Sequence, residues 1–443
     1  MERVLNPLQV SMRKFLVALV VSSIVAWGLA TQAGPLVGNV PQQVSGGKER
    51  PGSAFYQTGL QALGKKDYKA AEAAFQQSMQ LDPRWYGPLL GLAETAIAQG
   101  ASRDAKSWLR KAEALDPSSA HVQTALGRLY ARWGQNVKAE AAYKKAIALD
   151  AHAFLPRIDL ADLYLYALHR PAEAIEKYSA SLEVEPRHAG AHYGLAMALA
   201  QARQPREAVT EFERASSLAP ENPLPLLALG RLYFAGQEYD KSIGAYDRAL
   251  KLKPDSAAVH MGRGEVFFAT GQADRALSEY QAVLIVWPNS TLAYLKSGMI
   301  LEQQKHFDEA AAAYRKVIEY DPKNAVAYNN LAWIAAERRS ALDDALDWSK
   351  KAVGLAPSFS HFQDTLGWVY RSRGDLGHAA EVLEKAAARK PPDAVIHYHL
   401  GVVYSEQQRN EQALTALRKA LEIDSGFSAA RDAKRRIDAL SKS

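Results

Sequence analysis

Cysteine is absent from this chain, and neither sign of charge dominates it. Without cysteine there can be no disulfide, no thiol catalysis and no cysteine-ligated metal site. The 54 Lys and Arg residues nearly balance the 48 Asp and Glu residues, and the net charge of +6 is dispersed along the sequence. An excess so small and so scattered does not predict a nucleic-acid partner.

Catalytic signatures are also missing. The sequence contains no HExxH motif, no Gly-rich phosphate loop and no nucleophile elbow. His188 and His192 have a spacing that two metal ligands on one helix face can have, but we expect His188 in a turn and His192 on an exposed face. We expect His397 and His399 at ordinary surface and interface positions. We therefore predict no catalytic residue, no metal site, no cofactor and no enzymatic activity.

Long apolar runs are missing except at the N-terminus. Residues 15–30, "FLVALVVSSIVAWGLA", carry no charge, follow Arg13 and Lys14, and precede small residues that suit cleavage after Ala30 or Ala33. We predict a signal peptide over residues 1–33 and export to the periplasm. The alternative is that residues 15–30 stay uncleaved as an inner-membrane anchor facing the periplasm. Residues 34–52 are rich in Pro, Gly and polar residues and predict a flexible linker.

What the sequence does contain is a repeat. Its prolines recur at steps of 34 or 35 residues, with one double step, and alanine or serine takes their place at residues 151 and 425. We count eleven units over residues 53–425. The recurring prolines are Pro83, Pro117, Pro186, Pro220, Pro254, Pro288, Pro322, Pro357 and Pro391.

Small and large residues alternate within each unit. A small residue recurs at the eighth position, as in Gly127 and Gly298, and a large apolar residue recurs sixteen residues later, as in Tyr143 and Tyr314. A larger side chain at the eighth position would overpack two facing helices. Glycines at residues 100, 134, 271 and 374 fall where the first helix of a unit should end in a left-handed residue.

This period and pattern closely resemble the tetratricopeptide repeat. The resemblance implies an all-α fold, a right-handed superhelical solenoid of about eleven helix–turn–helix units whose neighbours share one core. Residues 426–443 carry an apolar stripe that begins at Phe427 and predict a capping helix with a short tail. Two units have 35 residues, and we expect the additional residue of each to lengthen the turn between the two helices.

In the resembled family, fixed positions of the first helices line a concave groove that binds ligands. Those positions here form a largely apolar stripe, which suits an adaptable protein-binding surface. The stripe consists of Tyr193, Met197, Leu227, Phe234, Met261, Phe268, Leu295, Met299, Asn330, Trp333, Trp368 and Tyr398. Packing between adjacent first helices is the alternative role of each. The polar groove positions alternate in sign and would orient a ligand: Glu94, Arg128, Asp162, Arg231, Glu265, Asp364 and Arg371.

The favoured interpretation is a non-catalytic scaffold in the cell envelope that binds a segment of a partner protein. The last units loosely resemble repeats of exopolysaccharide-export and envelope-assembly proteins. A membrane-anchored assembly factor is one alternative. A glycan-binding or enzyme-associated subunit, with Trp333 and Trp368 stacking on sugar rings, is another. Self-association of the exposed apolar groove would make the protein a homo-oligomer. The identity of the partner does not follow from the sequence.

Overall fold

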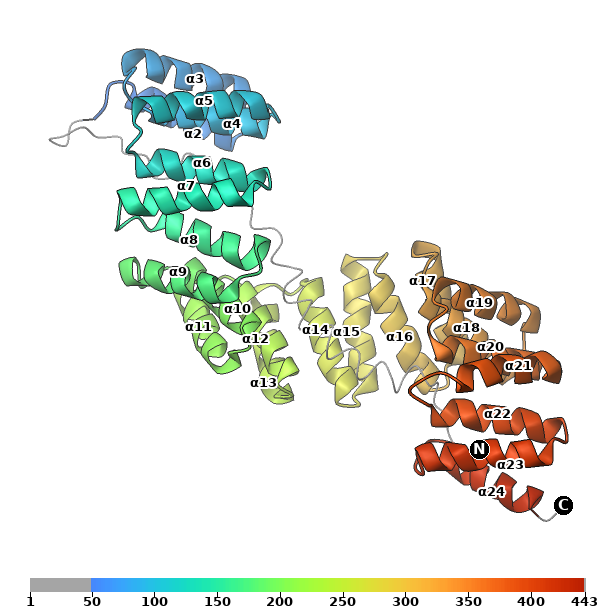
Figure 1. Ribbon diagram of the computed structural model, residues 1–443. Coiled ribbons are helices and arrows are strands. Elements are labelled where there is room, and N and C mark those ends of the chain that lie inside the picture. Colours follow the sequence, from blue (N-terminus) through green and yellow to red (C-terminus); the bar gives the residue numbers. More distant parts are fainter. Residues whose placement is uncertain (1–48, 442–443) are drawn as a thin grey trace. The chain divides into compact units, whose positions relative to one another are not determined.

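The computed structural model describes residues 49–441, and every regular element among them is a helix (Figure 1). The predicted signal peptide and nearly all of the predicted linker lie outside the described residues. The chain divides into two units, residues 49–232 and residues 233–441, and the division falls within helix α12 (Leu224–Ala235). The predicted all-α class is confirmed.

The described part of the first unit contains five helical pairs and the first part of α12. Its helices before α12 are α2 (Ser53–Gly64), α3 (Tyr68–Leu81), α4 (Gly87–Ala98), α5 (Ser102–Leu115), α6 (Ala120–Arg132), α7 (Asn136–Leu149), α8 (Leu155–Asp162), η2 (Leu163–Ala167), α9 (Pro171–Val184), α10 (Ala189–Gln201) and α11 (Pro205–Leu218).

The second unit continues the same alternation. Its helices after α12 are α13 (Tyr239–Leu252), α14 (Ala257–Ala269), α15 (Ala273–Val286), α16 (Thr291–Gln303), α17 (Phe307–Tyr320), α18 (Ala325–Arg338), α19 (Leu342–Leu355), α20 (Ser360–Ser372), α21 (Leu376–Ala387), α22 (Ala394–Glu406), α23 (Asn410–Ile423) and α24 (Ala430–Leu440).

Helices pack mainly with their neighbours in the sequence. The first helix of a repeat packs on the second, as α6 does on α7, and the second packs on the first helix of the next repeat, as α7 does on α8. First helices of successive repeats also meet, as α6 meets α8 and α18 meets α20. Each repeat therefore buries its apolar faces against adjacent repeats, as a solenoid requires.

The alternation of small and large residues closes each helical pair. A methyl group added to Gly127 would come within 2.5 Å of the Tyr143 ring, and one added to Gly298 would come within 2.6 Å of the Tyr314 ring. Both rings are completely buried. The glycines therefore give the rings the room that they fill, as the sequence predicts.

The turn within each repeat uses a left-handed residue. The predicted glycines adopt it, with φ of 67° at Gly134 and 78° at Gly271. Lys66 and Lys305 adopt it as well, with φ of 60° and 65°. A side chain in this conformation costs roughly 1–2 kcal/mol. The solenoid therefore imposes the turn even on repeats whose sequence lacks the glycine.

The two 35-residue repeats accommodate their additional residue differently. In the later one the first helix is longer, since α18 has 14 residues whereas α16 and α20 have 13 each. Its turn keeps the usual three residues, 339–341, of which Arg339 and Ala341 are left-handed. The prediction of a longer turn is therefore wrong for both repeats. In the earlier one the turn, residues 168–170, also has three residues. Helix α8 instead passes into the π-helix η2, in which the Leu168 amide donates to the Leu163 carbonyl at 3.0 Å. A π-turn absorbs one residue without ending the helix.

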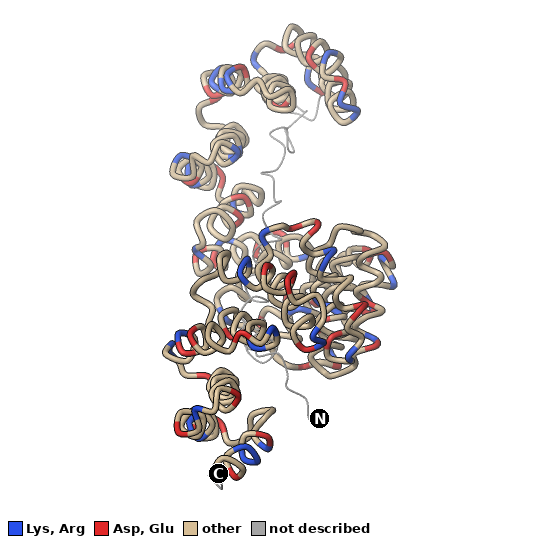
Figure 2. The backbone as a smooth tube through the Cα atoms, turned by 90° about the vertical axis from the view of Figure 1, so that its right-hand side faces the viewer, with Lys and Arg blue, Asp and Glu red and all other residues tan. Residues whose placement is uncertain are grey.

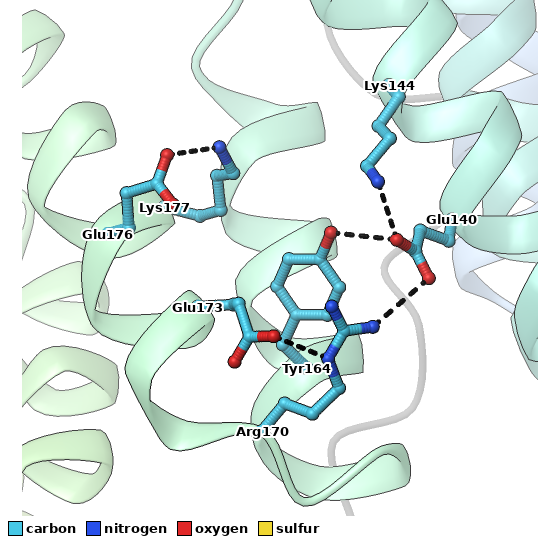
Figure 3. A network of polar contacts seen from close by, with 7 residues as sticks. All are labelled: Glu140, Lys144, Tyr164, Arg170, Glu173, Glu176 and Lys177. Atoms are coloured by element: carbon cyan, nitrogen blue, oxygen red, sulfur yellow. Dashed lines mark hydrogen bonds and ion pairs between the residues drawn. The ribbon is translucent and has the colours of Figure 1, made fainter.

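A polar network surrounds Tyr164 of η2 (Figure 3), and we call it the outer network. Glu140 on α7 accepts hydrogen bonds from the Tyr164 hydroxyl at 3.0 Å and from Lys144 at 2.6 Å. Arg170 lies over the Tyr164 ring, at 4.6 Å from its centroid, and donates to Glu173 at 2.7 Å. The hydrogen bond from Lys144 is the largest cause that lowers the pKa of Glu140. These contacts tie the π-turn to the helices on both sides of it.

The C-terminal helix α24 covers the last repeat. Phe427, Ala430 and Ala433 are buried against the core that includes Leu417, while Lys434 and Arg435 are exposed. No helix among residues 49–441 is long and apolar enough to cross a membrane. Acidic and basic residues are interspersed along both units (Figure 2), and no large region of one sign is visible.

Candidate functional site

The structure places most of the predicted apolar groove inside the protein. Eight of the twelve residues are buried, namely Met197, Leu227, Leu295, Met299, Asn330, Trp333, Trp368 and Tyr398, whereas Tyr193, Phe234, Met261 and Phe268 are partly exposed. Met299, which is 3% exposed, belongs to a core cluster with Tyr314 and Leu331. These buried residues pack between helices, and they leave little apolar surface for a ligand.

An aromatic cluster occupies the inside of α18, α20 and α22. The Trp333 and Trp368 rings stack with centroids 6.3 Å apart, and the His399 ring lies 4.1 Å from that of Trp368. Nδ1 of His399 lies 2.8 Å from Asp364, and both side chains are fully buried. His399 is therefore an interface residue between α20 and α22, as one part of the expectation has it, and it does not lie at the surface. The two tryptophans offer no open face to a sugar ring.

The histidines earlier in the chain are structural. The prediction that His188 lies in a turn is confirmed, because it caps α10 by accepting from the Ala191 amide. The predicted exposure of His192 is wrong. Its ring is buried and contacts Glu211 at 2.5 Å and the Pro186 carbonyl at 2.9 Å. Within residues 49–441 no three His, Asp or Glu side chains are placed to hold a metal ion.

An open pocket lies on the first helices of the N-terminal unit. Its volume is about 630 Å³, and it is lined by residues of α4, α6, α7, α8 and η2. The lining residues are Glu94, Ile97, Ala98, Ala131, Arg132, Asn136, Tyr143, Asp159, Asp162, Leu163, Tyr166 and Ala167. Two of the polar groove positions named from the sequence, Glu94 and Asp162, thus come together in one cavity. We call it the α4/α6/α8 pocket.

Ion pairs organise the walls of this pocket. Arg128 binds Asp159 at 2.6 Å, and both side chains are less than 10% exposed. Arg132 pairs with Glu94 at 3.3 Å. A buried ion pair of this kind is better evidence of fixed geometry than of stability, since desolvation offsets most of the attraction. Two guanidinium groups and two carboxylates therefore hold α4, α6 and α8 in register.

Asp162 differs from the other two carboxylates. The Tyr178 hydroxyl donates a hydrogen bond to it, and no Lys or Arg of residues 49–441 forms an ion pair with it. Burial raises the pKa of Asp162 to about 7, and the neighbouring Asp159 carboxylate acts in the same direction. Desolvation disfavours the charged form of an acid that lacks a cationic partner. Asp162 is therefore the carboxylate of this pocket that forms no ion pair among the described residues, and the charge of Arg128 acts on it only from a greater distance.

The π-turn η2 contributes one wall of the pocket. Leu163, Tyr166 and Ala167, all on η2, line it, while Tyr164 of the same turn joins the outer network. Burial raises the pKa of Tyr166, so its phenol stays protonated at neutral pH. π-turns are frequent at functional sites. The additional residue of this repeat was visible in the sequence, but its consequence for the pocket was not.

A second, smaller pocket adjoins Arg128 in the same unit. It has a volume of about 360 Å³ and is lined by three histidines, His121, His152 and His188, together with Arg128 and Glu185. Arg128 lines this pocket, whereas its partner Asp159 lines the α4/α6/α8 pocket. The Arg128–Asp159 ion pair therefore lies between two neighbouring cavities.

Comparison with known proteins supports the repeat assignment. Family models described as "Tetratricopeptide repeat" match residues 62–129, 120–152, 159–223, 227–291, 295–358 and 370–437, which together exceed half of the chain. A solved structure, a tetratricopeptide repeat protein from Parabacteroides merdae, aligns with a TM-score of 0.45 and 18% identity. That alignment covers 57% of this chain and 98% of that one.

Two curated relatives align over shorter stretches. Cellulose synthase operon protein C of Escherichia coli strain K12 is 34% identical over 83 residues, which are 19% of this chain and 7% of that protein. Anaphase-promoting complex subunit 3 of Schizosaccharomyces pombe is 25% identical over 151 residues, which are 34% of this chain and 23% of that protein. The alignments span less than a quarter of the length of either relative.

Proposed function

Because the chain belongs to the tetratricopeptide-repeat family, we propose that it is a non-catalytic scaffold that binds an extended segment of a partner protein on its first helices. Repeat solenoids of this kind serve as protein-interaction scaffolds. The α4/α6/α8 pocket carries the proposal, because it is a cavity of about 630 Å³ on that face with polar groups already oriented by ion pairs. Convergent polar groups in a cavity are the usual mark of a binding site.

We further propose that the scaffold works in the cell envelope, in exopolysaccharide export or in the assembly of an envelope complex. The uncharged run over residues 15–30 and the local similarity to cellulose synthase operon protein C support this. An inner-membrane anchor over residues 15–30 is the alternative form of the same proposal. The mass of the mature protein distinguishes the two, since cleavage after Ala30 or Ala33 removes the apolar run and an anchored chain keeps it.

Photo-crosslinking in the native cell tests the binding face. A benzophenone amino acid is placed at Ala98 or Ala167, which are exposed residues of the pocket. The matched control positions are Lys144 on α7 and Glu176 on α9, which lie around the outer network (Figure 3) and are 57% and 66% exposed. We expect one protein adduct at the two pocket positions and none at the controls. Adducts at the controls alone would refute binding on the first helices.

A further inference from the structure

We propose that the α4/α6/α8 pocket is an anchor site for a single basic side chain, lysine or arginine, of the bound segment. The inference rests on the proposed segment binding and adds the chemistry of the residue that the pocket takes. Glu94, Asp159 and Asp162 place three carboxylates on its walls. Arg132 and Arg128 supply two guanidinium groups, each paired with one of these carboxylates. Asp162 is therefore the carboxylate of the three that has no ion pair within residues 49–441, although the charge of Arg128 also favours its ionised form.

Asp162 marks the place where the positive charge of a ligand would bind. Its carboxylate accepts a hydrogen bond from the Tyr178 hydroxyl, and an ionised carboxylate has room for further donors. An ammonium or guanidinium group of a ligand would provide them as a charge-assisted hydrogen bond, which is roughly twice as strong as a neutral one. An anionic group would instead meet uncompensated negative charge in a partly desolvated cavity.

The remaining walls suit the aliphatic part of such a side chain. Ile97, Leu163 and Ala131 supply apolar surface, and lysine and arginine bury their methylene groups along surface of this kind while the charged end is solvated or paired. Tyr166 lines the same cavity and supplies an aromatic ring for a cation. The pocket therefore combines apolar lining residues for the methylene groups with carboxylates for the charged end.

The anchor should depend on pH, because a protonated Asp162 cannot neutralise the ligand. The titratable and charged groups around Asp162 are Glu94 on α4, Arg128 and Arg132 on α6, Tyr143 on α7, Asp159 on α8, Tyr166 on η2 and Tyr178 on α9. Burial raises the pKa of the three tyrosines, so they remain neutral. With Asp162 near 7, lowering the pH from 8 to 6 reduces its ionised fraction, and hence the affinity for a cation, by about tenfold.

Methyl NMR of the full-length protein provides the test. The methyl groups of Ile97 and Leu163 report from inside the pocket. The probes are pentapeptides of alanine with a central lysine or arginine, acetylated and amidated so that no terminal charge remains, and the control peptide carries norleucine. We expect saturable shifts of both methyl signals with lysine and arginine, with at least tenfold weaker binding of norleucine and about tenfold weaker binding at pH 6 than at pH 8.

Asp162→Asn is the matched variant, because it keeps the shape and removes the charge, and Glu140→Gln in the outer network is its control. We expect the first to lose at least tenfold in affinity for the lysine peptide and to lose the pH dependence, and the second to retain both. Equal binding of the norleucine peptide, or unchanged binding by Asp162→Asn, would overturn the anchor. The pH series on the unmodified protein tests the same carboxylate without any variant, and equal affinity at pH 6 and pH 8 would also overturn it.

The crosslinking experiment separates this inference from the proposed function. If adducts at Ala98 and Ala167 persist in the Asp162→Asn background while the lysine peptide fails to bind the unmodified protein, the scaffold proposal stands and the basic anchor is wrong. If the lysine peptide binds as expected and no adduct forms in the cell, the pocket chemistry stands and segment binding at this face is wrong.

Discussion

Replacing Gly298 by alanine tests the interlocking of small and large residues that closes each repeat. The new methyl group would lie 2.6 Å from one carbon of the Tyr314 ring and within 3.0 Å of two more. The ring is completely buried, and its hydroxyl donates to Glu302 at 2.8 Å, so it cannot turn aside without loss of that bond. The substitution therefore forces either the ring or the two helices apart.

The expected magnitude follows from two opposing effects. Overpacking a core costs about 1–3 kcal/mol, whereas replacing glycine by alanine inside a helix gains about 1 kcal/mol. Strain on the buried hydrogen bond adds roughly 0.5–1.5 kcal/mol to the cost. We expect a net loss of about 0.5–3.5 kcal/mol in the free energy of opening of α16 and α17.

Gly244 in α13 is the matched control, because an added methyl group there has no neighbour within 4 Å. Gly244→Ala should leave α16 and α17 unchanged and stabilise α13 by up to about 1 kcal/mol. Hydrogen exchange read by mass spectrometry resolves the two helical pairs, which a global melting curve of a repeat protein does not. Unchanged or slower exchange over residues 291–320 in Gly298→Ala would refute the packing argument.

Three further predictions concern charge and burial. Burial raises the folded pKa of Asp162 to about 7 from about 3.9 in an unfolded chain, so the folded state binds the additional proton. Asp162 should therefore lower the stability of the first unit, by at most about 4 kcal/mol, as the pH rises from 4 to 7. Asp162→Asn should remove this contribution in pH-dependent urea unfolding and leave the part that comes from Asp159, whose pKa burial also raises. Tyr164→Phe removes the hydrogen bond to Glu140 and should speed hydrogen exchange over residues 163–170, at a cost of about 1 kcal/mol; unchanged exchange would contradict the role of the outer network. Met299→Glu places an unpaired carboxylate in the core and should destabilise by several kcal/mol, whereas Met261→Glu, at a partly exposed site, should cost clearly less; equal losses in thermal melts would contradict the burial assignment.

The turn residues show how much of the backbone conformation can be predicted from residue type alone. Gly134 and Gly271 mark left-handed turns that can be predicted from glycine alone, because only glycine adopts positive φ without cost. Lys66 and Lys305 adopt the same conformation with no local signal. The repeat register identifies them, since each occupies the position that glycine takes elsewhere. Repeat periodicity therefore carries more information about the backbone of these turns than the identity of the individual residue does.

The groove positions show what the repeat pattern could not predict, namely which side chains are exposed. Register placed Met261 and Leu295 at equivalent groove positions, yet the first is partly exposed and the second is buried. The repeats are equivalent in backbone and differ in the side chains that cover each position. His399 shows the same limit, because its burial depends on Trp368 and Asp364, which belong to the preceding repeat. Whether a side chain is exposed therefore depends on the side chains of the neighbouring repeats that pack over it.

By itself the sequence determined the class of fold, the number and period of the repeats, the helical pairing and the capping segment, because these depend on local periodicity and on the size of residues sixteen apart. Only the tertiary structure decided where a cavity opens. The α4/α6/α8 pocket requires a π-turn that absorbs one additional residue, two ion pairs between successive first helices, and one carboxylate, Asp162, that forms no ion pair within residues 49–441. Each of these depends on distances between atoms of different repeats, which no period along the chain encodes.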